Sequence, residues 1–156
     1  MAVRPRPVPR FLEVPCPSPA YRRLRALREA LLRRPLGLRL SAADRKGERR
    51  QRHCLLLDAD DRILAGVVLR PVGPAAVQLR QMFVLPGHRG RGHGRRLLAG
   101  VEAVLARDGL LRIHLHARRD AVGFYRRCGY APDGSPFRTL GIGHQCMTKR
   151  LPRPPS

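Results

Sequence analysis

Several features common in other proteins are missing from this chain of 156 residues, which has no tryptophan and only 4% aromatic residues. No apolar run approaches the roughly 18 residues needed to span a membrane. The N-terminal residues include arginines and prolines but no apolar core of a signal peptide. These absences argue against a membrane segment and a secretory leader, and they predict a cytoplasmic protein.

Cysteines and metal-binding patterns are also sparse. The four cysteines form no C-x-x-C pair and have no spacing typical of metal ligands. We therefore expect reduced thiols and no metal site. The cluster Asp58-Ala59-Asp60-Asp61 is interpreted as a turn between two strands rather than as a metal site.

Acidic residues and lysines are few, so arginine dominates the charge. The chain has 11 Asp and Glu against 32 Lys and Arg, and its formal net charge is +21. Only Lys46 and Lys149 are lysines, and arginines occur in every segment. A basic protein can bind nucleic acid. The even spread of arginine, with abundant Ala, Pro, Gly and Leu, instead favours the compositional bias of a GC-rich bacterial genome, so nucleic acid is the less favoured partner.

The length is typical of one domain with a core of its own. The Pro- and Arg-rich residues 1–10 and the Pro-rich residues 152–156 are interpreted as tails, which leaves 11–151 as the domain. Hydrophobic periodicity predicts the regular elements. Strands are expected over 11–14, 54–57, 63–69, 76–85 and 111–117, helices over 18–34, 92–108 and 119–128, and a final pair of strands within 130–151.

A glycine-rich loop stands between the fourth predicted strand and the helix that follows. Its residues are Arg89, Gly90, Arg91, Gly92, His93 and Gly94. The first N–H groups of a helix have no partner within the helix, and the helix dipole favours an anion there. Glycines let such an anion approach the backbone closely. The loop, with Arg95 beside it, is therefore a candidate pyrophosphate cradle.

Glycines alone do not decide which cradle this is. A dinucleotide fold needs G-x-G-x-x-G early in a βαβ unit, and a P-loop needs G-x-x-x-x-G-K-[ST]. Neither pattern is present, because the glycines stand at 90, 92 and 94 and no lysine follows Gly94. A tight turn with a helix cap is the plain alternative.

The flanking motifs resemble those of the GNAT superfamily of N-acyltransferases. That family has an R/Q-x-x-G-x-G/A loop and, after a further strand, an A-x-x-F-Y-x-x-x-G-F segment. Here Arg89-x-x-Gly92-x-Gly94 is followed by Ala121-x-x-Phe124-Tyr125-x-x-x-Gly129-Tyr130. The stretch Gly141–Met147 is similar to the G-I-P-H-x-x-M strand of one uncharacterised branch. The resemblance extends from about residue 11 to 151.

The resemblance implies site residues and a co-substrate. The loop from Arg89 to Gly94, with Arg95, would bind the pyrophosphate of acetyl-CoA. The backbone of the preceding strand, at Met82, Phe83 and Val84, would pair with the pantetheine arm. Tyr125 would be the general acid that donates a proton to the departing sulfur. Without the motif, Tyr125 would be a packed aromatic residue and 82–84 plain core.

The general base is the weakest part of the pattern, because no Asp or Glu occurs between Ile63 and Glu102. His144 is the better histidine candidate, and His116 is the other. A water relay, or a purely structural role for both histidines, stays open. Gly143 stands where the branch has proline, and no acid precedes Gly141.

The expected fold is a single α/β (α+β) domain. Its mixed, mostly antiparallel sheet would be flanked by helices and splay between the strands ending at Leu85 and Ala117. The expected function is transfer of an acetyl or short acyl group from acetyl-CoA to an amine, by direct attack in a ternary complex. The acceptor would be a small molecule or a peptide, and the protein a monomer or homodimer. The alternative is a module that binds CoA or nucleic acid without catalysis.

Overall fold

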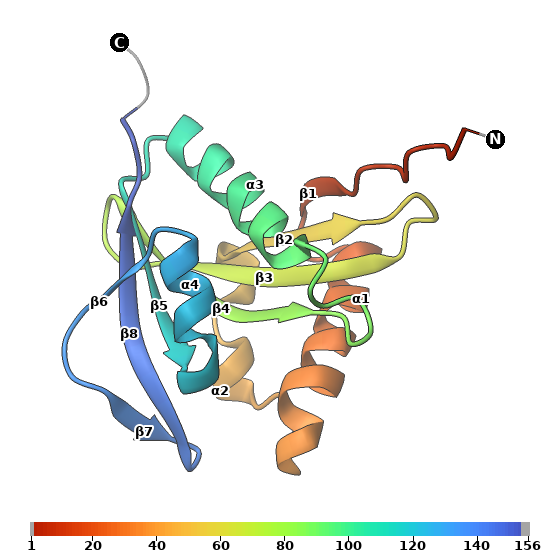
Figure 1. Ribbon diagram of the computed structural model, residues 1–156. Coiled ribbons are helices and arrows are strands. Elements are labelled where there is room, and N and C mark those ends of the chain that lie inside the picture. Colours follow the sequence, from red (N-terminus) through yellow and green to blue (C-terminus); the bar gives the residue numbers. More distant parts are fainter. Residues whose placement is uncertain (1, 154–156) are drawn as a thin grey trace.

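The computed structural model describes residues 2–153 and contains one mixed sheet (Figure 1). Strands lie in the order β1-β2-β3-β4-β5-β8-β6, with β7 also paired to β8. Only the β4–β5 pair is parallel among the pairings of this sheet. The strands are β1 (Arg10–Val14), β2 (Arg52–Leu57), β3 (Ile63–Pro71), β4 (Ala76–Val84), β5 (Arg112–Arg118), β6 (Ala131–Pro132), β7 (Phe137–Thr139) and β8 (Ile142–Arg150).

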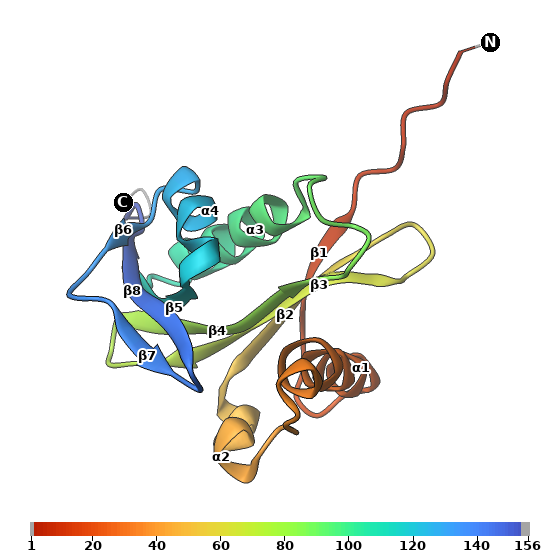
Figure 2. The same cartoon turned by 60° about the horizontal axis from the view of Figure 1, so that its bottom comes forward.

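Helices cover both faces of the sheet. Helices α3 (His93–Arg107) and α4 (Val122–Arg127) lie on one face, whereas α1 (Pro19–Arg28) and the short α2 (Ala42–Arg45) lie on the other (Figure 2). The predicted α/β class and the mostly antiparallel sheet are thereby confirmed. None of the helices within residues 2–153 is long and apolar enough to cross a membrane.

Local sequence signals place the ends of α1 and α3. The Ser18 hydroxyl accepts a hydrogen bond from the Tyr21 amide at 3.0 Å, and Pro19 follows at the first helical position. Beyond Arg28 the predicted single helix continues as a π-helical turn and a 3-10 turn, and it ends at Gly37 with φ of +71°. Gly109, with φ of +82°, follows the end of α3 in the same way.

The core has one layer on each side of the sheet. On the α3 side, Leu97, Leu98, Val101 and Leu105 are buried against the sheet at the spacing of one helix face. On the α1 side, Leu24 packs with strand residues that include Leu55, Leu57, Ile63 and Phe83. Burial of each such side chain contributes about 1.5–3 kcal/mol, so the two layers are the main source of stability.

The C-terminal part of the sheet differs from the prediction of two final strands, because three are present. Two of the three, β6 and β7, contain only two and three residues. Strands this short show no alternation of apolar and polar residues, which is why the sequence pattern did not separate them. They form by pairing with the long strand β8.

Candidate active site

Strands β4 and β5 separate towards their C-terminal ends. Their pairing runs only from Ala76 opposite Arg112 to Leu79 opposite Leu115, although both strands continue. A β-bulge explains the separation, because two β4 residues, Gln81 and Met82, lie opposite a single residue of β3. Gln81 has a φ of +51°, in the left-handed region. The predicted splay is present. Within residues 2–153, no strand pairs with residues 81–84 of β4 on the side that faces β5.

The glycine-rich loop leads into the N-terminus of α3. Gly92 is the N-cap with φ of +81°, and no side chain caps this helix end. The first backbone bond of the helix joins the Arg96 amide to the Gly92 carbonyl at 3.0 Å. The amides of residues 93–95 come before that bond, so they are available to an anion. A Cβ at Gly90 or Gly92 would meet no atom within 4 Å, which shows open space beside the loop.

Gly94 has a packing reason for lacking a side chain. A Cβ there would lie 2.9 Å from Cζ of Phe124, a distance that real Cβ atoms do not show. The sequence suggested that Gly94 lets a phosphate approach the backbone, whereas the structure fills that space with the Phe124 ring. Because Phe124 belongs to α4, this contact joins the two motifs on which the resemblance rests. The role of the Gly94 amide stays a prediction.

Tyr125 is buried beside the splay. Its hydroxyl donates to the Met82 sulfur at 3.5 Å, and Met82 belongs to the β4 bulge. Burial, with a smaller contribution from Cys128, raises the pKa of Tyr125 above its usual value. The phenol is therefore a proton donor throughout the neutral range. Helix α4 thus places a protonated hydroxyl near the β4 edge that β5 leaves free.

His144 lies one strand further from β4 than β5, opposite Arg118 in the β5–β8 register. Its Nδ1 is 2.8 Å from the Ile142 carbonyl oxygen, which can only accept a hydrogen bond. A neutral His144 therefore carries its proton on Nδ1 and presents an unprotonated Nε2. The His144 ring stacks on the Phe137 ring, and the His116 ring contacts the Phe137 ring edge-on. Burial, followed by repulsion from His144, lowers the pKa of His116.

A buried polar network on the α1 face was missed by the sequence analysis. Arg28 is fully buried and forms an ion pair with Glu48, which is 4% exposed. The Tyr21 hydroxyl also donates to Glu48, and Arg28 Nε donates to the Gln81 side chain at 2.6 Å. The network therefore connects α1 to the β4 bulge. One signal was present, because Arg28 interrupts the apolar stripe of α1 four residues after Leu24.

A model of the GNAT acetyltransferase domain matches residues 39–151, which is more than half of the chain. The chain belongs to the GNAT acetyltransferase family. The uncharacterised protein YyaT of Bacillus subtilis is 34% identical over 84 residues, which cover 54% of this chain and 56% of that protein. The chain spans about half the length of the curated relatives it matches.

Solved structures share the GNAT fold of this chain. A putative N-acetyltransferase from Lactobacillus plantarum superposes with a TM-score of 0.82 and 24% identity, covering 93% of this chain and 99% of the other. A spermidine N-acetyltransferase from Vibrio cholerae, solved with CoA and spermine, superposes with a TM-score of 0.68 and 15% identity, covering 90% of this chain and 95% of the other. At these identities the likeness establishes the fold, and the assignment to one branch of the family stays a prediction.

Proposed function

We propose that this GNAT protein transfers an acyl group, in the first instance acetyl, from acyl-CoA to an amine. The observation that carries the proposal is the position of Tyr125, whose hydroxyl lies 3.5 Å from the Met82 sulfur beside the unpaired edge of β4. Acyl transfer from a thioester uses a proton donor for the departing sulfur. The free strand edge and the uncapped helix N-terminus would supply backbone N–H groups to the acyl carbonyl and the phosphates.

The residues present fit acetyl-CoA. The open space at Gly90 and Gly92 and the free amides of residues 93–95 suit a pyrophosphate. Charge from Arg89, Arg91 and Arg95 would add to the attraction. The β4 edge at Met82, Phe83 and Val84 suits an extended amide-bearing arm, which would pair with it as an added strand. The His93 ring, whose Nδ1 is buried without a hydrogen-bond partner, lies at the same helix end.

The co-substrate would supply the acyl group as an activated thioester. The chain would hold the proton needed by the departing thiolate on the Tyr125 hydroxyl, which its raised pKa keeps protonated. Backbone N–H groups of the β4 bulge would polarise the carbonyl. We assign His144 Nε2, directly or through water, as the acceptor of the amine proton. Attack by the amine in a ternary complex needs no nucleophile from the protein.

Ligand-dependent thermal unfolding tests the first half of the proposal. Acetyl-CoA, CoA and ATP are compared in moderate salt, and a ligand at 100 times its dissociation constant should add about 2.7 kcal/mol of stability. Stabilisation by acetyl-CoA and CoA but not ATP is the expected result. Equal stabilisation by all three anions would instead indicate a generally basic surface and favour a nucleic-acid role.

Turnover of a Tyr125→Phe variant tests the second half. With an amine panel, and with product measured by mass spectrometry because free cysteines react with thiol reagents, we expect turnover to fall about 10²–10⁴-fold. Tyr130→Phe is the matched control, because it removes another buried hydroxyl, one without a hydrogen-bond partner. Unchanged turnover in Tyr125→Phe would remove this residue from the mechanism. Acetyl-CoA binding without turnover of any amine would leave a CoA-binding module.

A further inference from the structure

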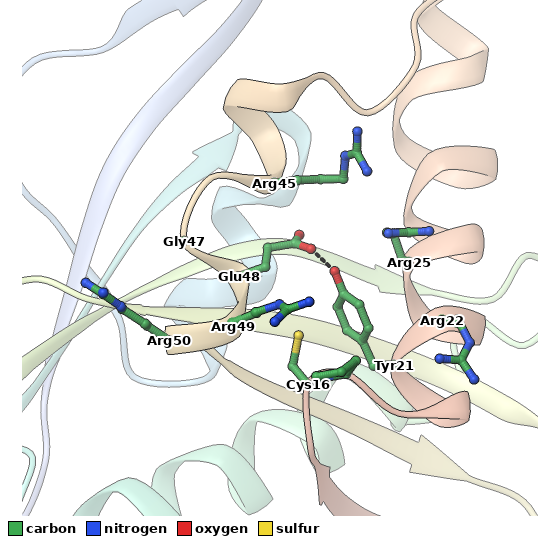
Figure 3. Close-up of a pocket in the computed structure, with 10 residues that line it drawn as sticks. Cys16, Tyr21, Arg22, Arg25, Arg45, Gly47, Glu48, Arg49 and Arg50 are labelled. Atoms are coloured by element: carbon green, nitrogen blue, oxygen red, sulfur yellow. Dashed lines mark hydrogen bonds between the residues drawn. The ribbon is translucent and has the colours of Figure 1, made fainter.

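A pocket of about 480 Å³ lies on the α1 face of the sheet. It opens between α1 and residues 45–50, with Cys16 and Pro17 at one side (Figure 3). The glycine-rich loop and α3 belong to the opposite face (Figure 2). The pocket is therefore separate from the proposed CoA site, and its volume is that of a site for a small molecule.

Five arginines line this pocket: Arg22, Arg25, Arg45, Arg49 and Arg50. Figure 3 shows the guanidinium groups of Arg25, Arg45 and Arg49 in the space between α1 and the 45–50 segment, whereas Arg50 extends away. Arg25 also lies over the Tyr21 ring, 5.8 Å from its centre. Two sides of the hollow thus contribute positive charge to the same space.

These arginines have no acidic partner among the described residues. The ion pairs within residues 2–153 use other arginines: Arg10, Arg28, Arg33, Arg52 and Arg107. Charges of one sign held around one hollow repel each other, and an anion bound between them relieves that repulsion.

Glu48 is the one carboxylate in the lining, and its charge is already used. It accepts hydrogen bonds from the buried Arg28 and from the Tyr21 hydroxyl. Burial, followed by the hydrogen bond to Glu48, raises the pKa of Tyr21 to about 12, so its hydroxyl stays a donor. The Glu48 and Arg28 charges therefore cancel each other, and the arginines that face the pocket stay uncompensated.

We infer that this pocket binds a small molecule that carries carboxylate or phosphate groups. Guanidinium groups bind both kinds of oxyanion through paired N–H donors. The same charges disfavour a polyamine. The site is distinct from the proposed CoA site, because it lies on the other face of the sheet, and its occupancy can be measured without turnover.

The test is a titration followed by amide NMR, which reports the pocket residues and the glycine-rich loop separately, so that binding at the two sites is distinguished. Citrate and inorganic phosphate are the two probes, and they separate a carboxylate ligand from a phosphate ligand. We expect saturable shifts at Gly47 and Arg49 with at least one probe. Spermine at equal ionic strength should give none.

Paired variants locate the binding. Arg25→Gln with Arg45→Gln should weaken the probe at least roughly tenfold, because each charge-assisted hydrogen bond contributes substantially. Arg39→Gln with Arg112→Gln removes the same charge from exposed positions outside the pocket and should change binding by less than about twofold. If the variant with Arg25→Gln and Arg45→Gln does not fold, the single variant Arg49→Gln, at an exposed position, replaces it.

Two outcomes would overturn the inference. One is the lack of any saturable shift at the pocket with either anion. The other is an equal loss of binding in the pocket and control variants, which would reduce the effect to overall charge. A shift with citrate alone or with phosphate alone supports the site and selects the ligand class.

Discussion

Replacing Arg28 by Met would leave a carboxylate buried without its charge partner. Arg28 is fully buried, Glu48 is 4% exposed, and the two side chains form an ion pair. Arg28 Nε also donates to Gln81 Oε1 at 2.6 Å, so the substitution removes a second hydrogen bond at the β4 bulge. The remaining donor to Glu48 is the neutral hydroxyl of Tyr21.

The expected cost is large for a domain of this size. Removal of one partner of a buried ion pair costs about 3–5 kcal/mol, against a total stability of about 5–15 kcal/mol. Glu48→Leu should cost a similar amount, because it leaves Arg28 charged and buried. The double variant Arg28→Met with Glu48→Leu leaves no buried charge, and apolar replacements of such pairs are often nearly neutral. Its cost should therefore be well below the sum of the single variants.

Urea unfolding of the four proteins, followed by circular dichroism, measures the coupling between the two residues. We expect a coupling free energy of at least about 3 kcal/mol. Costs that add to within about 0.5 kcal/mol would refute the reasoning, because independent sites behave in that way. If Arg28→Met is too unstable to purify, its cost equals or exceeds the total stability of the protein. The test is then whether the double variant recovers folding.

Three further results are expected. Gly94→Ala should cost about 1–3 kcal/mol in urea unfolding, since its Cβ would lie 2.9 Å from Phe124; no loss would mean that α4 moves freely. Gly66→Ala should cost at least as much, because its Cβ would lie 2.2 Å from the Leu24 side chain; an unchanged midpoint would contradict this packing. Asp44→Asn should cost about 1–2 kcal/mol at pH 7. The Arg33 hydrogen bond lowers the pKa of Asp44 from 3.8 to about 2. The stability difference between wild type and Asp44→Asn should therefore shrink as the pH falls from about 3.8 to about 2, and a difference that stays constant would contradict the assignment.

Much of the framework around the candidate site could be predicted because its signals are local. The glycine loop, the helix with apolar residues at 97, 98, 101 and 105, and the strands on either side are each encoded by residues close in sequence. The glycine loop and the segment from Ala121 to Tyr130 resemble GNAT motifs, and the domain match confirmed the family. The separation of β4 from β5 was expected from the resemblance and is present.

Other parts depend on contacts that no local pattern reports. The residue at the left-handed position of the β4 bulge is Gln81, where glycine or asparagine would have been the usual signal. Its side chain is held by Arg28, which precedes it by 53 residues. The packing role of Gly94 could not be predicted from local sequence either, because the Phe124 ring that fills the space beside it comes from a different helix.

The sequence by itself determined most of the strands and helices and the position of the glycine loop, since hydrophobic periodicity and turn residues act over short distances, and its motifs indicated the family. The tertiary structure decided where β4 leaves β5, which arginine is buried, and which arginines share one pocket. Those outcomes depend on how side chains distant in sequence meet, because a charged group is stable in the core only when folding brings it a partner.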